Sequence, residues 1–222
     1  IQHPAATVID CKGLKIYPGM IDSGTKLGLA EISAVSLTQD HNEIGEFTPH
    51  MNALTAVNPS SVNIPVSRVN GVTTSLAVPS GGRFPGTAAL INLHGYTPDQ
   101  MYAGFSGVVF NFPSSGKRGR WDRRSEEDIK KDAEKAQKGL NEFWEKAQLH
   151  AKIVANAKAQ GKKTKFAPQL DALVDVANGE APLLIEVNKK EDILSAISWI
   201  NKQKVKAVFT GVAEGYRVTD SL

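Results

Sequence analysis

An alternation of strand and helix patterns in the last quarter of the chain constrains the fold more than any other feature. Residues 181–187 are apolar and β-branched, and residues 205–210 have a similar composition. Between them, residues 191–204 begin with acidic side chains and then carry isoleucines at helical spacing. A strand, a helix and a second strand in this order form the crossover unit of a parallel sheet. The pattern therefore predicts an α/β fold with a parallel sheet or a barrel.

Earlier parts of the chain carry further runs with the composition of buried strands. These are residues 20–22, 71–78, 88–93 and 107–112. A short helix is predicted between the last two runs, because Thr97 is a suitable cap and Pro98 suits the first helical position.

A long amphipathic helix is predicted from Ser125 to about Gly161. Asp128 stands three residues after Ser125, as in a capping box. Apolar residues then recur at alternating spacings of four and three: Ile129, Ala133, Ala136, Leu140, Phe143, Ala147, Val154 and Ala157. His150 lies on this stripe, and we expect it to be a packed or edge histidine. A second helix is expected over residues 168–178, ending at a glycine.

Residues 16–29, with the sequence IYPGMIDSGTKLGL, carry the most specific motif of the chain. They resemble the first barrel strand of the metal-dependent amidohydrolase superfamily, whose members typically have P-G-(L/F/M)-I-D-x-H-x-H there. The match is close through residues 18–22. The G-V-T-T sequence at the start of residues 71–78 is also common at the second barrel strand of that superfamily. The resemblance is to imidazolonepropionase-like members.

This resemblance implies a TIM-like (β/α) barrel, incomplete in this segment, with the end of a flanking β-sandwich. Residues 1–17 would be the remnant of the sandwich, formed by two β-rich runs around a bend. Residues 18–222 would form about six of the eight barrel strands, with a long inserted helix near residues 125–160. We therefore expect the remainder of the barrel, or a second subunit, to complete the sheet.

The resemblance also places metal ligands on this chain, but the ligand histidines are absent. The four ligand positions fall on Gly24, Lys26, Glu186 and Gly211. Two histidines two residues apart on a strand can share one metal, whereas glycine offers no ligand and a protonated lysine repels a cation. We therefore expect no metal or other cofactor in this segment. Zinc or another divalent metal is expected only in active relatives.

Several polar residues are candidates for a pocket at the barrel mouth: Asp22, Lys26, His94, Asn111, Glu186 and Glu214. His94 and Asn111 come near the ends of strand runs, and the resemblance keeps a glutamate at Glu214. Lys26 and Glu186 would both point into the mouth in the register of the resemblance. They would then form a buried ion pair that either stabilises the barrel, which is the preferred interpretation, or binds a zwitterionic or peptide-like ligand.

Two other polar stretches are given structural interpretations. The residues Glu31, Asp40, His41, Glu43, Glu46 and His50 have no ligand spacing of a helix or strand, and prolines interrupt their segment. A loop over the barrel mouth is the preferred interpretation. Residues 117–124 place five basic side chains around one tryptophan, but acidic residues follow directly, so a solvated linker is expected.

Composition and motifs exclude several classes of protein. The net charge of +3 is too small to indicate a nucleic-acid partner, and no apolar run approaches the roughly 20 residues of a membrane span. Cys11, as the single cysteine, excludes an internal disulfide. The sequence has no GxSxG elbow and no strand-associated GxGxxG. The compartment stays open, with the bacterial periplasm as one alternative, since the chain begins without methionine and a signal peptide would have been lost from view.

Two classes of function follow from the resemblance. The first is a hydrolase of C–N bonds, in amides or cyclic ureides, with an altered or absent metal centre. The alternative is a non-catalytic relative, a pseudoenzyme, that binds a small-molecule ligand or a partner at the barrel mouth. A homo-oligomer is compatible with both. The metal dependence of any activity distinguishes the two classes.

Overall fold

The computed structural model describes residues 7, 9–117 and 121–222. A sheet of six strands, arranged in chain order, forms its centre: β1 (Met20–Thr25), β2 (Val72–Ala77), β3 (Gly86–Asn92), β4 (Tyr102–Asn111), β5 (Leu183–Val187) and β6 (Ala207–Gly211). The α-helices are α1 (Ala53–Ala56), α2 (Asn63–Val69), α3 (Pro98–Met101), α4 (Glu126–Ala159), α5 (Pro168–Asp171), α6 (Val174–Ala177) and α7 (Lys190–Gln203). Short 3-10 helices are η1 (Ser36–Thr38), η2 (Gly215–Arg217) and η3 (Thr219–Ser221).

The sheet is mixed, because one strand runs against the others. β1 pairs with β2 in parallel, and β4, β5 and β6 also pair in parallel. β3 is antiparallel to both of its neighbours, β2 and β4. A barrel of the TIM type has parallel strands only, so β3 is a departure from the strand succession that the resemblance implied. The six strands coincide with predicted runs, although β4 begins at Tyr102, five residues before the predicted run of residues 107–112.

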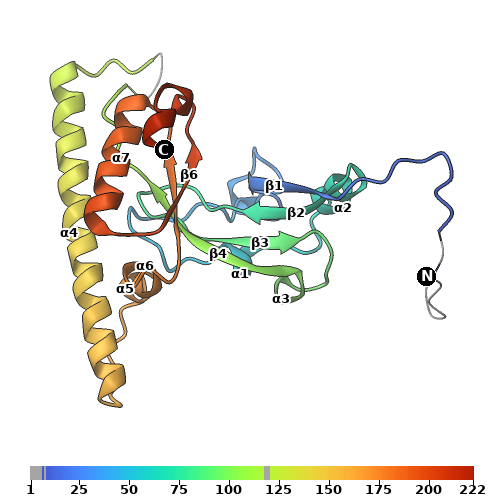
Figure 1. Cartoon of the computed structure of the whole chain (residues 1–222), viewed down its shortest axis with the longest axis horizontal. Helices are drawn as coiled ribbons and strands as arrows, with labels where there is room; N and C mark the ends of the chain where they lie inside the picture. The colour runs from blue at the N-terminus through green and yellow to red at the C-terminus, as the bar shows by residue number, and fades with distance from the viewer. Residues whose placement is uncertain (1–6, 8, 118–120) are drawn as a thin grey trace.

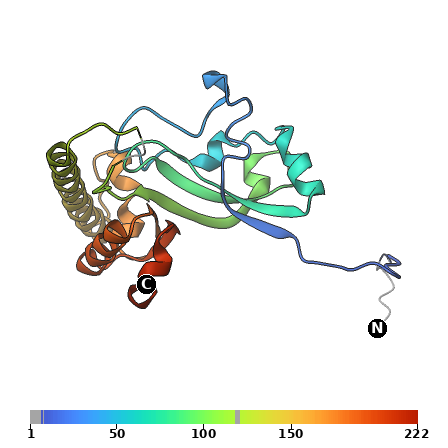
Figure 2. The ribbon, with the colours of Figure 1, turned by 90° about the horizontal axis from the view of Figure 1, so that it is seen from above.

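The sheet is curled and open rather than closed. β1 and β6 are its two edge strands, yet both line a single cavity on the same face of the sheet. That is possible only if the sheet curls around this face, as Figure 2 shows from above. The α/β fold class and the incomplete TIM-like barrel are therefore confirmed.

Helices cover the convex face and bury most of the apolar residues. Around β4 and β5, α4 and α7 enclose an aromatic core that includes Phe84, Phe110, Trp144 and Trp199. A second cluster, under α1, α2 and α3, includes Leu29, Ile64, Ile91 and Met101. On the concave face, the described residues form a small buried cluster: Leu76, Ala88, Val109 and Leu184.

The long helix is confirmed as α4, which stands at one end of the sheet (Figure 1). The Ser125 hydroxyl accepts a hydrogen bond from the Asp128 amide, as predicted for the cap. Its 34 residues correspond to about 50 Å of helix. His150 is buried on this helix, and its Nε2 lies 2.6 Å from Asp171 Oδ1. The second predicted helix is divided into α5 and α6, with a turn between them.

The N-terminal hairpin prediction lies partly outside the described residues. Residues 7 and 9–17 contain no strand, and a turn at Lys12 and Gly13 separates extended, mostly exposed residues. Residues 9–17 lead away from the sheet (Figure 1). The assignment of this segment to a β-sandwich stays a prediction. The basic stretch of residues 117–124 also lies partly outside the described residues.

None of the helices in the described residues is both long and apolar enough to cross a membrane.

Candidate functional site

A cavity of about 700 Å³ opens where the parallel strands end, on the concave face of the sheet. Apolar side chains from five strands, β2 to β6, form its floor: Leu76, Leu90, Val109, Leu184 and Val208. Polar residues that lie at or after strand ends surround it: Asp22, Ser23, Lys26, Ser80, Glu186 and Thr210. In barrels of this type, the carboxyl ends of the strands are where ligands bind and reactions take place. The cavity is therefore the candidate functional site.

Several of the predicted site residues meet at this cavity. Asp22 and Lys26 come from β1 and the residue after it, and Glu186 comes from β5. Gly24 and Gly211, two of the predicted former ligand positions, also line it. Residues as far apart in the chain as Asp22 and Gly211 therefore share one cavity. Curling of the sheet brings them together.

Lys26 and Glu186 do not form the buried ion pair that was predicted. Both residues are exposed, and in the part of the chain that the structure describes no ion pair joins them. They lie on strands at different positions around the curled sheet, and the buried-pair prediction is wrong here. Each charged group is instead available to a molecule in the cavity.

His94 lies near the amino end of β2, whereas the cavity lies at the carboxyl ends of the parallel strands. It follows β3, which is antiparallel to its neighbours, and the nearby Leu93 amide donates to the Thr73 carbonyl at the start of β2. The prediction that His94 faces the barrel mouth is therefore wrong. The sequence identified a strand end correctly but could not identify the direction of the strand.

Asn111 ends β4 and holds a loop beside the cavity instead of facing its interior. Its Nδ2 donates hydrogen bonds to the carbonyl oxygens of Gly81 and Gly82, at 3.0 and 2.8 Å. The Arg83 guanidinium in turn donates to the Asn111 carbonyl. Asn111 thus fixes the loop that follows β2.

Glu214 also lies outside the cavity lining, at the amino end of α7. Its Oε2 accepts a hydrogen bond from the Lys190 amide at 2.8 Å, and Arg217 lies 3.4 Å from its other oxygen. The hydrogen bond from the Lys190 amide is the main cause that lowers the pKa of Glu214 below its ordinary value of 4.5, with the Arg217 charge adding to it. Glu214 therefore caps a helix that has no side-chain cap of its own.

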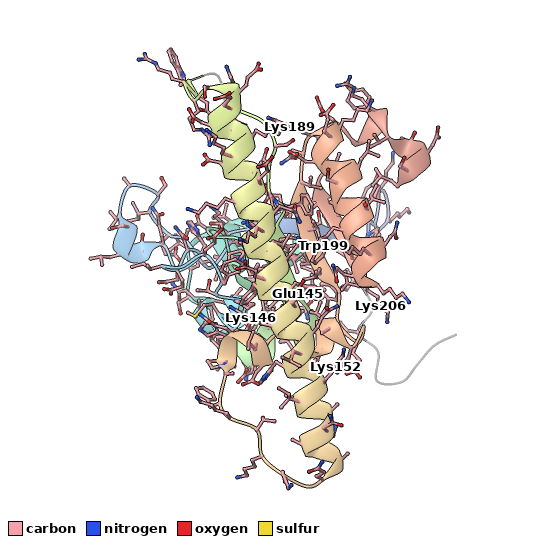
Figure 3. All side chains as sticks on the ribbon, turned by 90° about the vertical axis from the view of Figure 1, so that its left-hand side faces the viewer. Glu145, Lys146, Lys152, Lys189, Trp199 and Lys206 are labelled. Atoms are coloured by element: carbon pink, nitrogen blue, oxygen red, sulfur yellow. The ribbon has the colours of Figure 1, made fainter. Side chains whose placement is uncertain are left out.

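The cap predicts a specific dependence of stability on pH. Because the pKa of Glu214 is lowered by folding, its stabilising effect is present above pH 4.5 and disappears as the pH falls through the lowered pKa. Glu214→Gln should lower the Tm by about 1–2 °C near neutral pH, and this difference should vanish in acid. Thermal unfolding followed by circular dichroism between pH 3 and 7 measures it. Glu145→Gln, on the exposed face of α4 (Figure 3), is the control and should show no such difference.

Sequence reasoning missed one pair of residues at the cavity. His41 Nδ1 lies 2.8 Å from Ser80 Oγ, and Ser80 lines the cavity. Burial, and then the nearby Lys26 charge, lower the pKa of His41 below its ordinary value of 6.5. The two residues are 39 positions apart and lie in loops, so no spacing rule could have paired them.

The other polar residues of the 30–70 segment serve separate structural contacts. Glu31 accepts hydrogen bonds from Asn58 and Ser61, and Glu46 pairs with Arg83 at 3.4 Å. Several residues of this segment pair with the loop after β2, as the backbone contacts of Glu46 with Arg83 and Phe84 show.

Comparison with known proteins gives no match to a family model and none to a curated protein. Among solved structures, the chain is similar to the crystal structure of an amidohydrolase from Thermotoga maritima MSB8, with a TM-score of 0.82 and 21% sequence identity. The match covers 99% of this chain. The fold is that of an amidohydrolase. This chain spans 57% of the length of the Thermotoga protein, and at this identity the likeness establishes the fold alone.

At the four positions where the resemblance places metal ligands, the chain carries Gly24, Lys26, Glu186 and Gly211. Gly24 has space for a side chain, since a Cβ there would meet only Val78, at 3.9 Å. At Gly211 a side chain is disfavoured, because its φ is +80° and a Cβ would also displace the Asn188 side chain, whose Oδ1 would lie 2.6 Å away. Among the four positions only Glu186 can donate to a metal, and the described residues contain no group of three His, Cys, Asp or Glu that could hold one.

Proposed function

We propose that this amidohydrolase-like protein binds a small zwitterionic or peptide-like molecule in the cavity on the concave face of the sheet. The single observation that carries the proposal is the presence of one cation, Lys26, and two anions, Asp22 and Glu186, in the same cavity, with no ion pair joining Lys26 to either anion in the described part of the chain. A ligand carboxylate can contact the Lys26 ammonium while a ligand ammonium contacts Glu186. The apolar floor then receives the hydrophobic part of the molecule.

Dipeptides test this proposal because their two charges can be removed separately. The free dipeptide Ala-Leu, its N-acetylated form and its C-amidated form are titrated into the purified protein by calorimetry. We expect the free dipeptide to bind about three- to tenfold more tightly than either blocked form, since each exposed charge contributes about 0.7–1.4 kcal/mol.

Two variants assign the contacts. Lys26→Met should remove the preference for a free carboxylate, and Glu186→Gln should remove the preference for a free amine. Lys146→Met is the control, because Lys146 is exposed on α4, away from the cavity (Figure 3). Equal binding of the three peptides to the unmodified protein would contradict the proposal.

Hydrolysis of a C–N bond in the same cavity is the second candidate function, and the amidohydrolase fold favours it. Because the donor set does not fit a metal centre, we expect any hydrolysis of amides or cyclic ureides to continue in the presence of a chelator. Loss of hydrolysis after chelation, with recovery on addition of zinc, would instead indicate ligands supplied by another part of the protein.

The edges of the sheet support a role for a further barrel segment. β1 is exposed along nearly its whole length, and Ile21 and Val208, on the two edge strands, are 66% and 49% exposed. We propose that the remainder of the barrel, or a second subunit, pairs with these edges and narrows the cavity around its ligand.

A further inference from the structure

Ser80 and His41 are held together by two contacts. Besides the 2.8 Å contact between Ser80 Oγ and His41 Nδ1, the Ser80 amide donates to the His41 carbonyl at 2.7 Å. The backbone contact fixes the position of one residue relative to the other. The side-chain contact is therefore a built feature of these two loops and not a chance meeting of two mobile side chains.

The two residues lie between two cavities. Ser80 lines the large cavity together with Lys26, whereas His41 lines a smaller cavity of about 270 Å³ behind it, together with Pro79. Ser80 thus borders the space that receives the ligand, and His41, its hydrogen-bond partner, borders the smaller cavity. Both residues are only partly buried.

The loop that carries Ser80 is fixed on its other side. Asn111 donates to the carbonyls of Gly81 and Gly82, the two residues after Ser80. Asn42, the residue after His41, forms an isolated parallel β-bridge with Ser80 through the backbone. A serine that is hydrogen-bonded to a histidine and held by rigid neighbours is the arrangement in which a hydroxyl acts as a nucleophile.

We propose that Ser80 is a nucleophile and His41 its general base, and that together they hydrolyse a small amide or ester in the cavity without a metal. The substrate class rests on the proposed function, because the molecule must first occupy the cavity between Lys26 and Glu186. No serine-hydrolase motif surrounds Ser80, so the pair is recognised by geometry alone.

The reaction is balanced by these groups and water. Ser80 Oγ forms a bond to the carbonyl carbon while its proton moves to His41 Nδ1. The Lys26 charge, which also acts on His41, favours the negative charge that develops on the carbonyl oxygen without needing to leave the ligand carboxylate. The carbon–nitrogen or carbon–oxygen bond then breaks, and the proton on His41 goes to the leaving amine or alcohol. Water releases the acyl group by the same steps in reverse order and restores Ser80.

The charge state of His41 suits this role. Lowering of its pKa by burial and by Lys26 keeps the imidazole neutral at pH 7, so Nδ1 can accept the serine proton when the other nitrogen carries the hydrogen. The charged groups near it are Lys26 and the preceding Asp40, and Glu43 lines the same small cavity. As the pH falls through the lowered pKa of His41, the imidazole takes up a proton and can no longer act as a base.

A fluorophosphonate probe tests the proposal directly, because it reacts covalently with an activated serine. We expect mass spectrometry of the labelled, chelator-treated protein to place the adduct on Ser80. Ser80→Ala should abolish labelling, and His41→Ala should slow it by about 100-fold or more. Ser195→Ala is the control, since Ser195 is an exposed serine on α7 that lies outside the cavity lining. The labelling rate should be independent of pH near neutrality and should decrease below pH 6.5, as His41 takes up a proton.

Three results would overturn the proposal: no adduct on the unmodified protein, an adduct on a serine other than Ser80, or a labelling rate that His41→Ala leaves unchanged. Circular dichroism of each variant shows that the fold is retained. Ser80→Ala should still bind the free dipeptide, because both charges that recognise it remain. Failure of labelling with normal dipeptide binding would therefore remove the nucleophile and leave the binding function intact.

Discussion

Trp144→Ala is expected to lower the free energy of unfolding by about 3–5 kcal/mol. Trp144 lies on α4 and is 1% exposed, and its ring meets that of Trp199 edge to face, with centroids 5.3 Å apart. Trp199 belongs to α7, which lies beside α4 (Figure 3), and its Nε1 donates to Asn141 of α4. Removal of the Trp144 ring leaves a cavity where the long helix contacts the rest of the core. Urea unfolding followed by far-UV circular dichroism measures the change.

Trp144→Phe is the matched control. The Trp144 indole nitrogen is buried and has no hydrogen-bond partner in the described residues, so phenylalanine loses ring volume but no hydrogen bond. We expect a cost of about 1–2 kcal/mol. In contrast, Trp199 Nε1 donates to Asn141 at 3.3 Å. A loss below 1 kcal/mol for Trp144→Ala would mean that α4 is not anchored by this contact.

Asp192→Ala is the second large prediction, with an expected loss of about 2–4 kcal/mol. Asp192 is 4% exposed in the first turn of α7, and its carboxylate accepts hydrogen bonds from the Ser115 amide at 2.9 Å and from the Ser114 hydroxyl at 3.0 Å. It also accepts from the Ser115 hydroxyl. Alanine leaves these donors without their acceptor, so the loop after β4 loses its attachment to α7.

Glu191→Ala is the control for the helix dipole, because Glu191 is an exposed acidic residue in the same first turn. Its loss should cost about 0.3–1 kcal/mol. Asp192→Asn retains one acceptor oxygen and should give an intermediate value. The same unfolding assay compares the three variants. Equal effects of Asp192→Ala and Glu191→Ala would show that the loop contact contributes nothing beyond the dipole.

The strands and the long helix could be predicted from the sequence because local chemistry decides them. Apolar runs and helical spacing predict the alternation of β5, α7 and β6. The cap at Ser125 and the apolar stripe predict α4. Two details were missed within α4: Trp144 and Ala151 are buried although they lie beside the predicted stripe. Neighbouring helices widen the buried face beyond the narrow stripe that periodicity predicts.

The site was predicted in part. Lys26 and Glu186 line the cavity because both belong to the ends of parallel strands, where the motif at residues 16–29 placed them. The prediction that His94 faces the barrel mouth was wrong, because the direction of β3 depends on its pairing with β2 and β4. The residues of β3 alone do not encode this direction. Asn111 and Glu214 were identified as polar residues of interest, yet their oxygen and nitrogen atoms are used to hold a loop and to cap a helix.

The sequence by itself determined the α/β class, the strand runs, the long helix and the charged residues that meet at the cavity. These features depend on side-chain periodicity, on caps and on one motif, all of which act within a few residues. Only the tertiary structure decided the reversed direction of β3, the separation of Lys26 from Glu186, and the contact of His41 with Ser80. The reason is physical: strand pairing and loop contacts depend on packing between distant segments, and that information is distributed over the whole chain.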